Sequence, residues 1–270
     1  MRMVKDIAGI WCILLMYIAL VYADYVVVRW VILHSLRESL WAPLHALLFN
    51  ALVLLLSVTH LRAAFTDPGR VPLPQNRVDL SDLHIEEVES ASEKSPINSQ
   101  ENWSVCRLCE TYTPPEASHC SVCNRCIRGM DHHCPWINNC IGERNHRYFL
   151  QFLVYVGILA IYSMVLLIGS WVLECPGCSE DSAVRMSRFM HSLILFLECS
   201  VFGMFVVVVL VDQFEQILRV QPVETNKKFG HKLYLLLVHV YGFEHPLLRV
   251  LMCRRRAGRF RKDLLNERVV

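Results

Sequence analysis

The chain has 270 residues, of which 54% are hydrophobic and only 19% are charged, and its net charge at neutral pH is +2. This composition excludes a disordered chain and a coiled coil, and it argues against a soluble globular protein. The nearly balanced charge also indicates that the chain has no role in binding nucleic acid.

Four apolar segments are long enough to cross a bilayer as helices, which takes about 20 residues. The first has an uncharged core from Ile7 to Ala23, and only Glu198 interrupts the fourth. Helices of a soluble bundle would show a polar face, and these segments have none. The sequence therefore predicts an all-α integral membrane protein with transmembrane helices at residues 7–33, 41–61, 148–173 and 189–211.

The basic residues are distributed unevenly between the two sides of the predicted membrane. Of the 27 Lys and Arg residues, 23 lie in three segments, residues 1–6, 62–147 and 212–270. The two short loops on the other side hold only Arg37, Arg185 and Arg188. Because basic loops stay in the cytosol, this asymmetry predicts that both termini and the long second loop are cytosolic.

The second loop begins with a turn and an acidic linker, at residues 62–105. Thr66-Asp67-Pro68-Gly69 is a turn sequence directly after the second span. The composition from Val78 to Asn102 is polar and acidic, which predicts a flexible linker. A cysteine-rich block follows at residues 106–147.

The C-terminal tail, residues 212–270, contains a short apolar segment and a basic cluster. Leu233 to Tyr241 is too short to cross a membrane, so an interfacial helix is expected. The basic residues from Arg254 to Lys262 are either a solvated tail or a site for anionic lipid, at about 1 kcal/mol per charge.

Seven of the twelve cysteines lie between Cys106 and Cys140. This density indicates a disulfide scaffold in a secreted protein, and metal or thiol chemistry in a cytosolic one. Two residues separate Cys106 from Cys109, and two separate Cys120 from Cys123. Paired thiolates at this spacing are typical zinc ligands. The block has few aliphatic residues, so bound metal would have to supply its folding free energy.

Counting the ligands leaves one thiol over. Two zinc sites of three Cys and one His each would use six of the seven cysteines. Cys134 follows Asp131-His132-His133, and a thiol beside an imidazole and a carboxylate has what a nucleophile needs. Counting alone leaves two alternatives open: Cys134 is the nucleophile, or it is a ligand and another cysteine is spare.

The block resembles the DHHC protein S-acyltransferases, which are integral-membrane palmitoyltransferases. The resemblance rests on the tetrad Asp131-His132-His133-Cys134, on the spacing of the cysteines around it, on the Asp67-Pro68-Gly69 turn and on the four spans. Asp24 and Glu198, which lie within spans, are similar to residues of the Golgi-type members.

The resemblance implies a role for each residue of the block. Cys134 would be the acyl-carrying nucleophile, His132 the general base and Asp131 the carboxylate that orients it. Two structural zinc ions would be bound, one by Cys106, Cys109, His119 and Cys126, and the other by Cys120, Cys123, His133 and Cys140.

The resemblance also implies a reaction and a location. The enzyme would transfer a fatty acyl group, most commonly palmitoyl, from acyl-CoA to cysteine thiols of membrane-associated proteins, at the Golgi or endoplasmic reticulum membrane. In related enzymes a residue in the third span limits the depth available to the acyl chain. Leu159 holds the matching position, although simple helix packing is an equal alternative.

Two segments after the fourth span depart from the family pattern. Pro222-Val223-Glu224-Thr225 stands where the family commonly has Thr-Thr-x-Glu, and Leu236 stands where an Asn is expected before Tyr241-Gly242. These departures keep a second hypothesis open, a catalytically weak or inactive zinc-stabilised membrane adaptor. A RING-like ligase does not fit the ligand spacing.

Overall fold

The computed structural model describes residues 6–35, 39–73, 103–172, 181–220 and 240–241. The chain forms two compact units, Met1–Gly203 and Met204–Val270. The acidic linker and the basic cluster lie outside the described residues, as do Pro222-Val223-Glu224-Thr225, Leu236 and nearly all of the expected interfacial helix.

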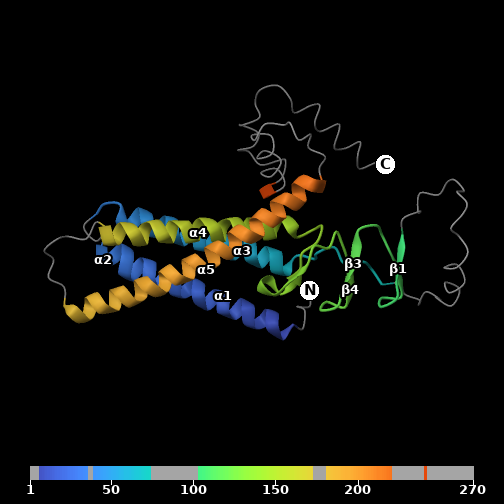
Figure 1. Ribbon diagram of the computed structural model, residues 1–270, viewed down its shortest axis with the longest axis horizontal. Coiled ribbons are helices and arrows are strands. Elements are labelled where there is room, and N and C mark those ends of the chain that lie inside the picture. Colours follow the sequence, from blue (N-terminus) through green and yellow to red (C-terminus); the bar gives the residue numbers. More distant parts are fainter. Residues whose placement is uncertain (1–5, 36–38, 74–102, 173–180, 221–239, 242–270) are drawn as a thin grey trace, which may run out of the picture. The chain divides into compact units, whose positions relative to one another are not determined.

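Four long helices make up most of the described chain (Figure 1). Each is long and apolar enough to cross a membrane, and apolar side chains such as Ile18, Leu47 and Ile161 are exposed on their outer faces. So large an exposed apolar surface is rare on soluble proteins and is typical of a protein surrounded by lipid. The predicted membrane protein with four helical spans is therefore confirmed. Its helices are α1 (Ile7–Val26) with the π-helical η1 (Val27–Ile32) and α2 (Leu33–Ser35), α3 (Ala42–Phe65), α4 (His146–Val172), and α5 (Ser182–Val220).

Helix α3 packs against α4 (Figure 1). Phe49 of α3 is fully buried and its ring stacks on Tyr162 of α4, with 6.2 Å between the ring centroids. The Tyr162 hydroxyl also forms a hydrogen bond of 2.7 Å with Nδ1 of His45. Shape-matched packing and a hydrogen bond between side chains are the forces that join helices in lipid, where burying apolar surface gives no advantage.

The buried Arg188 of α5 forms hydrogen bonds with α2 and α4, at the end of the helices remote from the cysteine-rich block. Arg188 is 2% exposed, and its Nη2 donates to the Ser170 carbonyl at 2.8 Å and to Ser35 Oγ at 3.2 Å. Its guanidinium lies 4.4 Å from the centre of the Trp171 ring. Arg185 and Arg188 thus belong to α5, and not to the loop in which the sequence analysis counted them, because α5 begins several residues before the purely apolar run.

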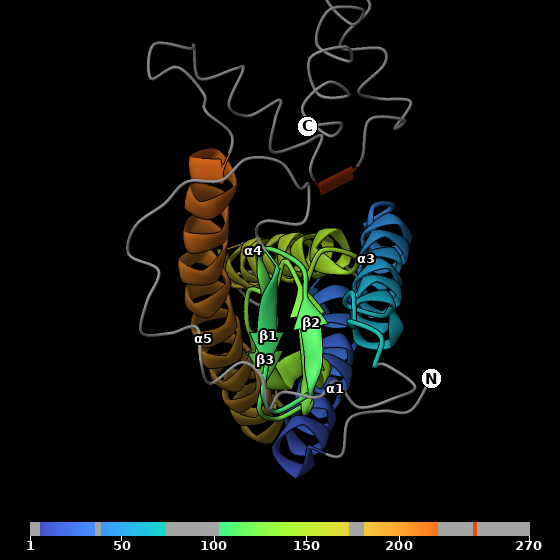
Figure 2. The same cartoon turned by 90° about the vertical axis from the view of Figure 1, so that its right-hand side faces the viewer.

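The cysteine-rich block adds three short antiparallel hairpins to the helical architecture, which the sequence analysis did not include (Figure 2). Two-stranded sheets of this size are at best marginally stable alone. Their order must come from the groups that the hairpins hold together. The pairs are β1 (Ser104–Cys106) with β2 (Thr111–Thr113), β3 (Ala117–Cys120) with β4 (Arg125–Arg128), and β5 (His133–Cys134) with β6 (Asn139–Cys140).

Two asparagines fasten the block to the end of α3. The side-chain amide of Asn139 donates to the carbonyls of Ala64 and Thr66, both at 3.0 Å, and that of Asn145 donates to the Ala63 carbonyl at 3.1 Å. The last carbonyls of a helix have no partner within the helix, so these bonds satisfy groups that would otherwise be unpaired.

The turn after α3 adds a second connection to the block. Asp67 Oδ1 accepts hydrogen bonds of 2.9 Å from the backbone N–H groups of Gly69 and Arg70. Burial opposes the charge, but these two bonds hold the pKa of Asp67 below its ordinary value. Gly69 has φ +110°, which a residue with a side chain rarely adopts, and its carbonyl accepts from the Arg128 N–H of β4 at 2.9 Å.

Candidate active site and metal centres

The first group of metal-ligating side chains lies between β1 and the β3–β4 hairpin. Nδ1 of His119 is 3.2 Å from Cys109 Sγ, 3.6 Å from Cys106 Sγ and 3.8 Å from Cys126 Sγ. All four ligand atoms lie within 4.8 Å of one another. Three thiols and one imidazole converging on one point are a typical donor set for a structural zinc ion.

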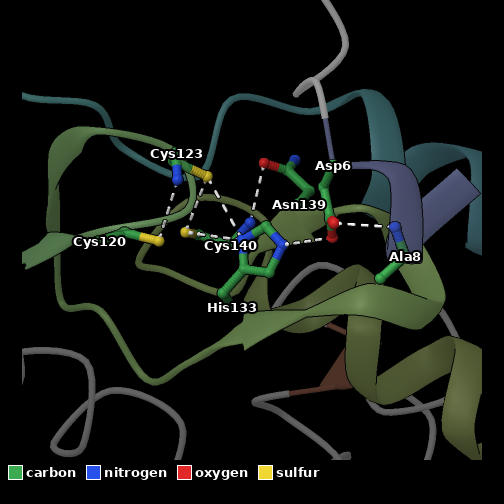
Figure 3. A network of polar contacts seen from close by, with 7 residues as sticks. All are labelled: Asp6, Ala8, Cys120, Cys123, His133, Asn139 and Cys140. Carbon is green, nitrogen blue, oxygen red and sulfur yellow. Dashed lines mark hydrogen bonds and ion pairs between the residues drawn. The ribbon is translucent and has the colours of Figure 1, made fainter.

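The second group joins the β3–β4 hairpin to the β5–β6 hairpin (Figure 3). Cys123 Sγ is 3.2 Å from Cys140 Sγ and 3.4 Å from Nδ1 of His133, and Cys120 completes the set. The hydrogen bond between the Cys123 and Cys140 thiols lowers the pKa of Cys123 and raises that of Cys140, so Cys123 ionises first. A thiol that ionises readily suits metal binding, which requires thiolate ligands.

Both groups can hold a metal ion, and their chemistry fits zinc. The structure brings together the same two sets of four residues that the family resemblance implied, one through Cys106, Cys109, His119 and Cys126 and one through Cys120, Cys123, His133 and Cys140. The individual ligand roles remain predictions.

Cys134 belongs to neither group. Its side chain is 5% exposed, and it stands beside His132, whose Nδ1 lies 3.1 Å from Asp131 Oδ2. Hydrogen bonding to Asp131, and then to Cys134, raises the pKa of His132 to about 9. An imidazole with a raised pKa can hold a proton taken from a neighbouring thiol. The thiol, the imidazole and the carboxylate are therefore arranged in the order that nucleophilic catalysis would need.

Strand β5 explains how His133 and the adjacent Cys134 can have different surroundings. Successive side chains of a strand point to opposite faces, so His133 and Cys134 cannot face the same way. His133 pairs with Cys140, its neighbour in the metal group, while Cys134 pairs with Asn139, which caps α3. The ring of His132, two residues before Cys134, packs edge-on against Phe149 of α4, at 5.7 Å between centroids.

Comparison with known proteins identifies this region. Residues 99–228 match the model of a family described as DHHC palmitoyltransferase. The chain contains a DHHC palmitoyltransferase domain. The matched residues include the tetrad, both metal-ligating groups and α4.

Curated relatives of the DHHC domain carry the same description. The chain is 36% identical to human "Palmitoyltransferase ZDHHC3" over 189 residues, which are 70% of this chain and 58% of that protein. It is 33% identical to "Palmitoyltransferase ZDHHC7" of Rattus norvegicus over 195 residues, 69% of this chain and 59% of the relative. "Probable protein S-acyltransferase 16" of Arabidopsis thaliana is 34% identical over 157 residues, 57% of this chain and 51% of the relative. The chain thus spans a little over half the length of these relatives.

His60 supports the DHHC domain from within α3 and was missed by the sequence analysis. It is 1% exposed, and its two ring nitrogens each lie 3.0 Å from a partner, the Tyr17 hydroxyl of α1 and the Trp136 carbonyl. The ring also packs edge-on against Phe152 of α4. A histidine in an apolar span is a sequence signal for a buried polar contact, but the partner at Trp136, 76 residues away, could not be predicted.

Proposed function

We propose that this chain is a protein S-palmitoyltransferase, which moves a long-chain acyl group from acyl-CoA to cysteine thiols of membrane-associated proteins. One observation carries the proposal: Cys134 is buried, lies outside both metal-ligating groups and contacts His132. The names of the curated relatives support the same reaction.

The first half-reaction loads the enzyme. His132 takes the proton from Cys134 Sγ, and Asp131 holds the imidazole by accepting from its Nδ1–H. The thiolate attacks the thioester carbon of acyl-CoA, and the carbon–sulfur bond to CoA breaks. His132 returns the proton to the departing CoA thiolate, which leaves an acyl thioester on Cys134.

The second half-reaction transfers the acyl group to the protein substrate. His132 takes the proton from the substrate cysteine, whose thiolate attacks the thioester on Cys134. The bond to Cys134 breaks, and the released thiolate recovers the proton from His132. The two zinc ions would hold the hairpins around this site and take part in neither step.

The membrane location suits the substrate. Keeping a long acyl chain in hydrocarbon is favourable by about 0.8 kcal/mol per methylene, so a thiol at the membrane face can meet the thioester without drawing the chain into water. His132, two residues before Cys134, packs against Phe149 in the first turn of α4. Trp136, two residues after Cys134, contacts His60 near the end of α3.

Intact-mass measurement tests the proposed reaction. The purified protein in detergent is incubated with palmitoyl-CoA and should gain one acyl group, which hydroxylamine removes because it cleaves thioesters. A zinc-stabilised adaptor, the competing hypothesis, would keep its mass unchanged and would overturn the proposal.

Acyl-chain length should depend on Leu159 of α4, which is 6% exposed. If its side chain closes the space for the chain end, Leu159→Ala should favour longer chains by roughly fourfold per added buried methylene, the equivalent of about 0.8 kcal/mol. Competitive labelling with C14, C16 and C18 acyl-CoA measures this shift. Ile161→Ala on the outer face of the same helix, where Ile161 is 68% exposed, is the matched control. Equal labelling patterns in both variants would reject the role.

We also propose that the chain lies in the Golgi or endoplasmic reticulum membrane, with both termini and the DHHC domain on the cytosolic side. The excess of Lys and Arg in the N-terminal, second-loop and C-terminal segments supports this orientation. Tags at Met1 and Val270 should be digested by protease added to sealed microsomes. Protection of either tag would contradict the orientation.

A further inference from the structure

Asp6, directly before the first span, reaches into the second metal-ligating group (Figure 3). Its Oδ2 lies 3.3 Å from Nε2 of His133, and its Oδ1 accepts a hydrogen bond of 3.0 Å from the backbone N–H of Ala8. Both side chains are largely buried: that of Asp6 is 14% exposed and that of His133 is 10% exposed. One carboxylate thus caps helix α1 and contacts a predicted zinc ligand 127 residues away.

The orientation of the His133 ring decides which nitrogen would bind the metal and which would contact Asp6. Nδ1 faces the sulfurs, 3.4 Å from Cys123 and 3.6 Å from Cys140, so Nδ1 is the nitrogen that would bind the metal. The ring proton then resides on Nε2, which points at Asp6. Metal-binding histidines in proteins almost always donate their other N–H to a carboxylate, carbonyl or water, and this partner fixes the ring's tautomer and direction.

The first turn of α1 comes unusually close to the turn after Cys134. A Cβ placed on Gly9 would meet Asn138 Oδ1 at 2.7 Å and Asp6 Oδ2 at 2.8 Å. Only glycine permits this approach without displacement of its neighbours. Gly9 therefore leaves room for the start of the first span to lie close to the β5–β6 hairpin, where Asp6 contacts His133.

We propose that Asp6 is a positioning residue of the second metal centre, which it supports by accepting the Nε2–H of His133. Because His133 and Cys134 are consecutive in β5, the same bond fixes the strand that carries the thiol. The proposal goes beyond acyl transfer and rests only on the ligand assignment within the proposed function.

Asp6→Ser separates the two roles of the carboxylate. Serine is a good N-cap residue and can still accept from the Ala8 N–H, but its side chain is too short to reach His133. Asp6→Asn nearly keeps the shape, yet its single oxygen cannot serve both Ala8 and His133. Asp181→Ser is the matched control, because Asp181 Oδ1 accepts from the Ala183 N–H before α5 in the same way.

Zinc release measures the effect without any acyl donor. The full-length variants in detergent are mixed with an excess of a chromogenic zinc chelator, and the release of each zinc equivalent is followed over time. Removing such a partner usually weakens metal affinity about 10- to 100-fold, and weaker binding speeds release. Asp6→Ser and Asp6→Asn should therefore lose one of two zinc ions about 10- to 100-fold faster than the unaltered protein. Asp181→Ser should match the unaltered protein.

Two results would overturn the proposal. In the first, both Asp6 variants release both zinc ions at the unaltered rate. In the second, both ions leave faster to the same extent together with a lower Tm, which would mean that Asp6 acts only through the fold. Absence of acylation in the unaltered protein would contradict the proposed function and leave this measurement valid.

Discussion

Replacing Cys134 by serine is expected to abolish the acyl thioester while both zinc ions stay bound. Cys134 lies outside the two metal-ligating groups, so its loss removes no ligand, and serine fits the space of the buried thiol. A serine hydroxyl is a far poorer nucleophile beside this base. Intact mass after incubation with palmitoyl-CoA, together with elemental analysis for zinc, measures both outcomes.

Substitutions of His132 and Asp131 should slow acyl loading without removing the thiol, and they can be compared with Cys134→Ser. His132→Ala should also keep two zinc ions but load the acyl group about 10²- to 10⁴-fold more slowly, the usual contribution of a general base. Asp131→Ala should be slower because the imidazole loses the carboxylate that orients it. If Cys134→Ser instead loses a zinc ion and aggregates, Cys134 is a ligand and its catalytic role must be abandoned.

Replacing Cys120 by serine is expected to unfold the cysteine-rich block. Cys120 is buried with Ile127 and Cys140 in a very small apolar cluster, so the hairpins have almost no core to keep them folded without metal. Structural zinc contributes roughly 10–16 kcal/mol of apparent binding free energy in zinc-finger peptides, far more than such a cluster could replace. Zinc content should fall from two to one or fewer, and acyl loading should be lost with it.

Cys199→Ser is the matched control for this experiment. Cys199 is also a buried thiol, but it lies in α5 and in neither metal-ligating group. The Cys199→Ser variant should keep both zinc ions and near-normal thermal stability. If Cys120→Ser keeps two zinc ions and its acyl loading, the second metal centre has been assigned wrongly.

The spans could be predicted from the sequence because each is a long apolar run, and their ends could be predicted less well. α5 begins at Ser182 because its first turns, although polar, continue the helix and place Arg188 against Ser170 and Trp171. Hydropathy alone cannot detect such an extension. The hairpins were missed because strands of two to four residues held by shared ligands have no alternating apolar pattern.

The chemistry of the site was easier to predict than its supports. The spacing of cysteines and histidines, with the family resemblance, indicated the two sets of residues that the structure brings together. Asp6, His60 and Asn139 act through partners more than 70 residues away in the chain, and one sequence carries no information on those pairings.

The two-residue pairing of β5 with β6 also has a consequence for how the chain folds. A shift of this pairing by one position would exchange the faces of His133 and Cys134, directing the thiol to the metal and the imidazole away from it. A chain with this shifted pairing could still bind zinc, but its Cys134 thiol would no longer lie beside His132 and could not carry the acyl group. The hydrogen bonds from Asn139 to the end of α3 hold β6 in place, so they favour the register in which Cys134 lies opposite Asn139 and His133 opposite Cys140.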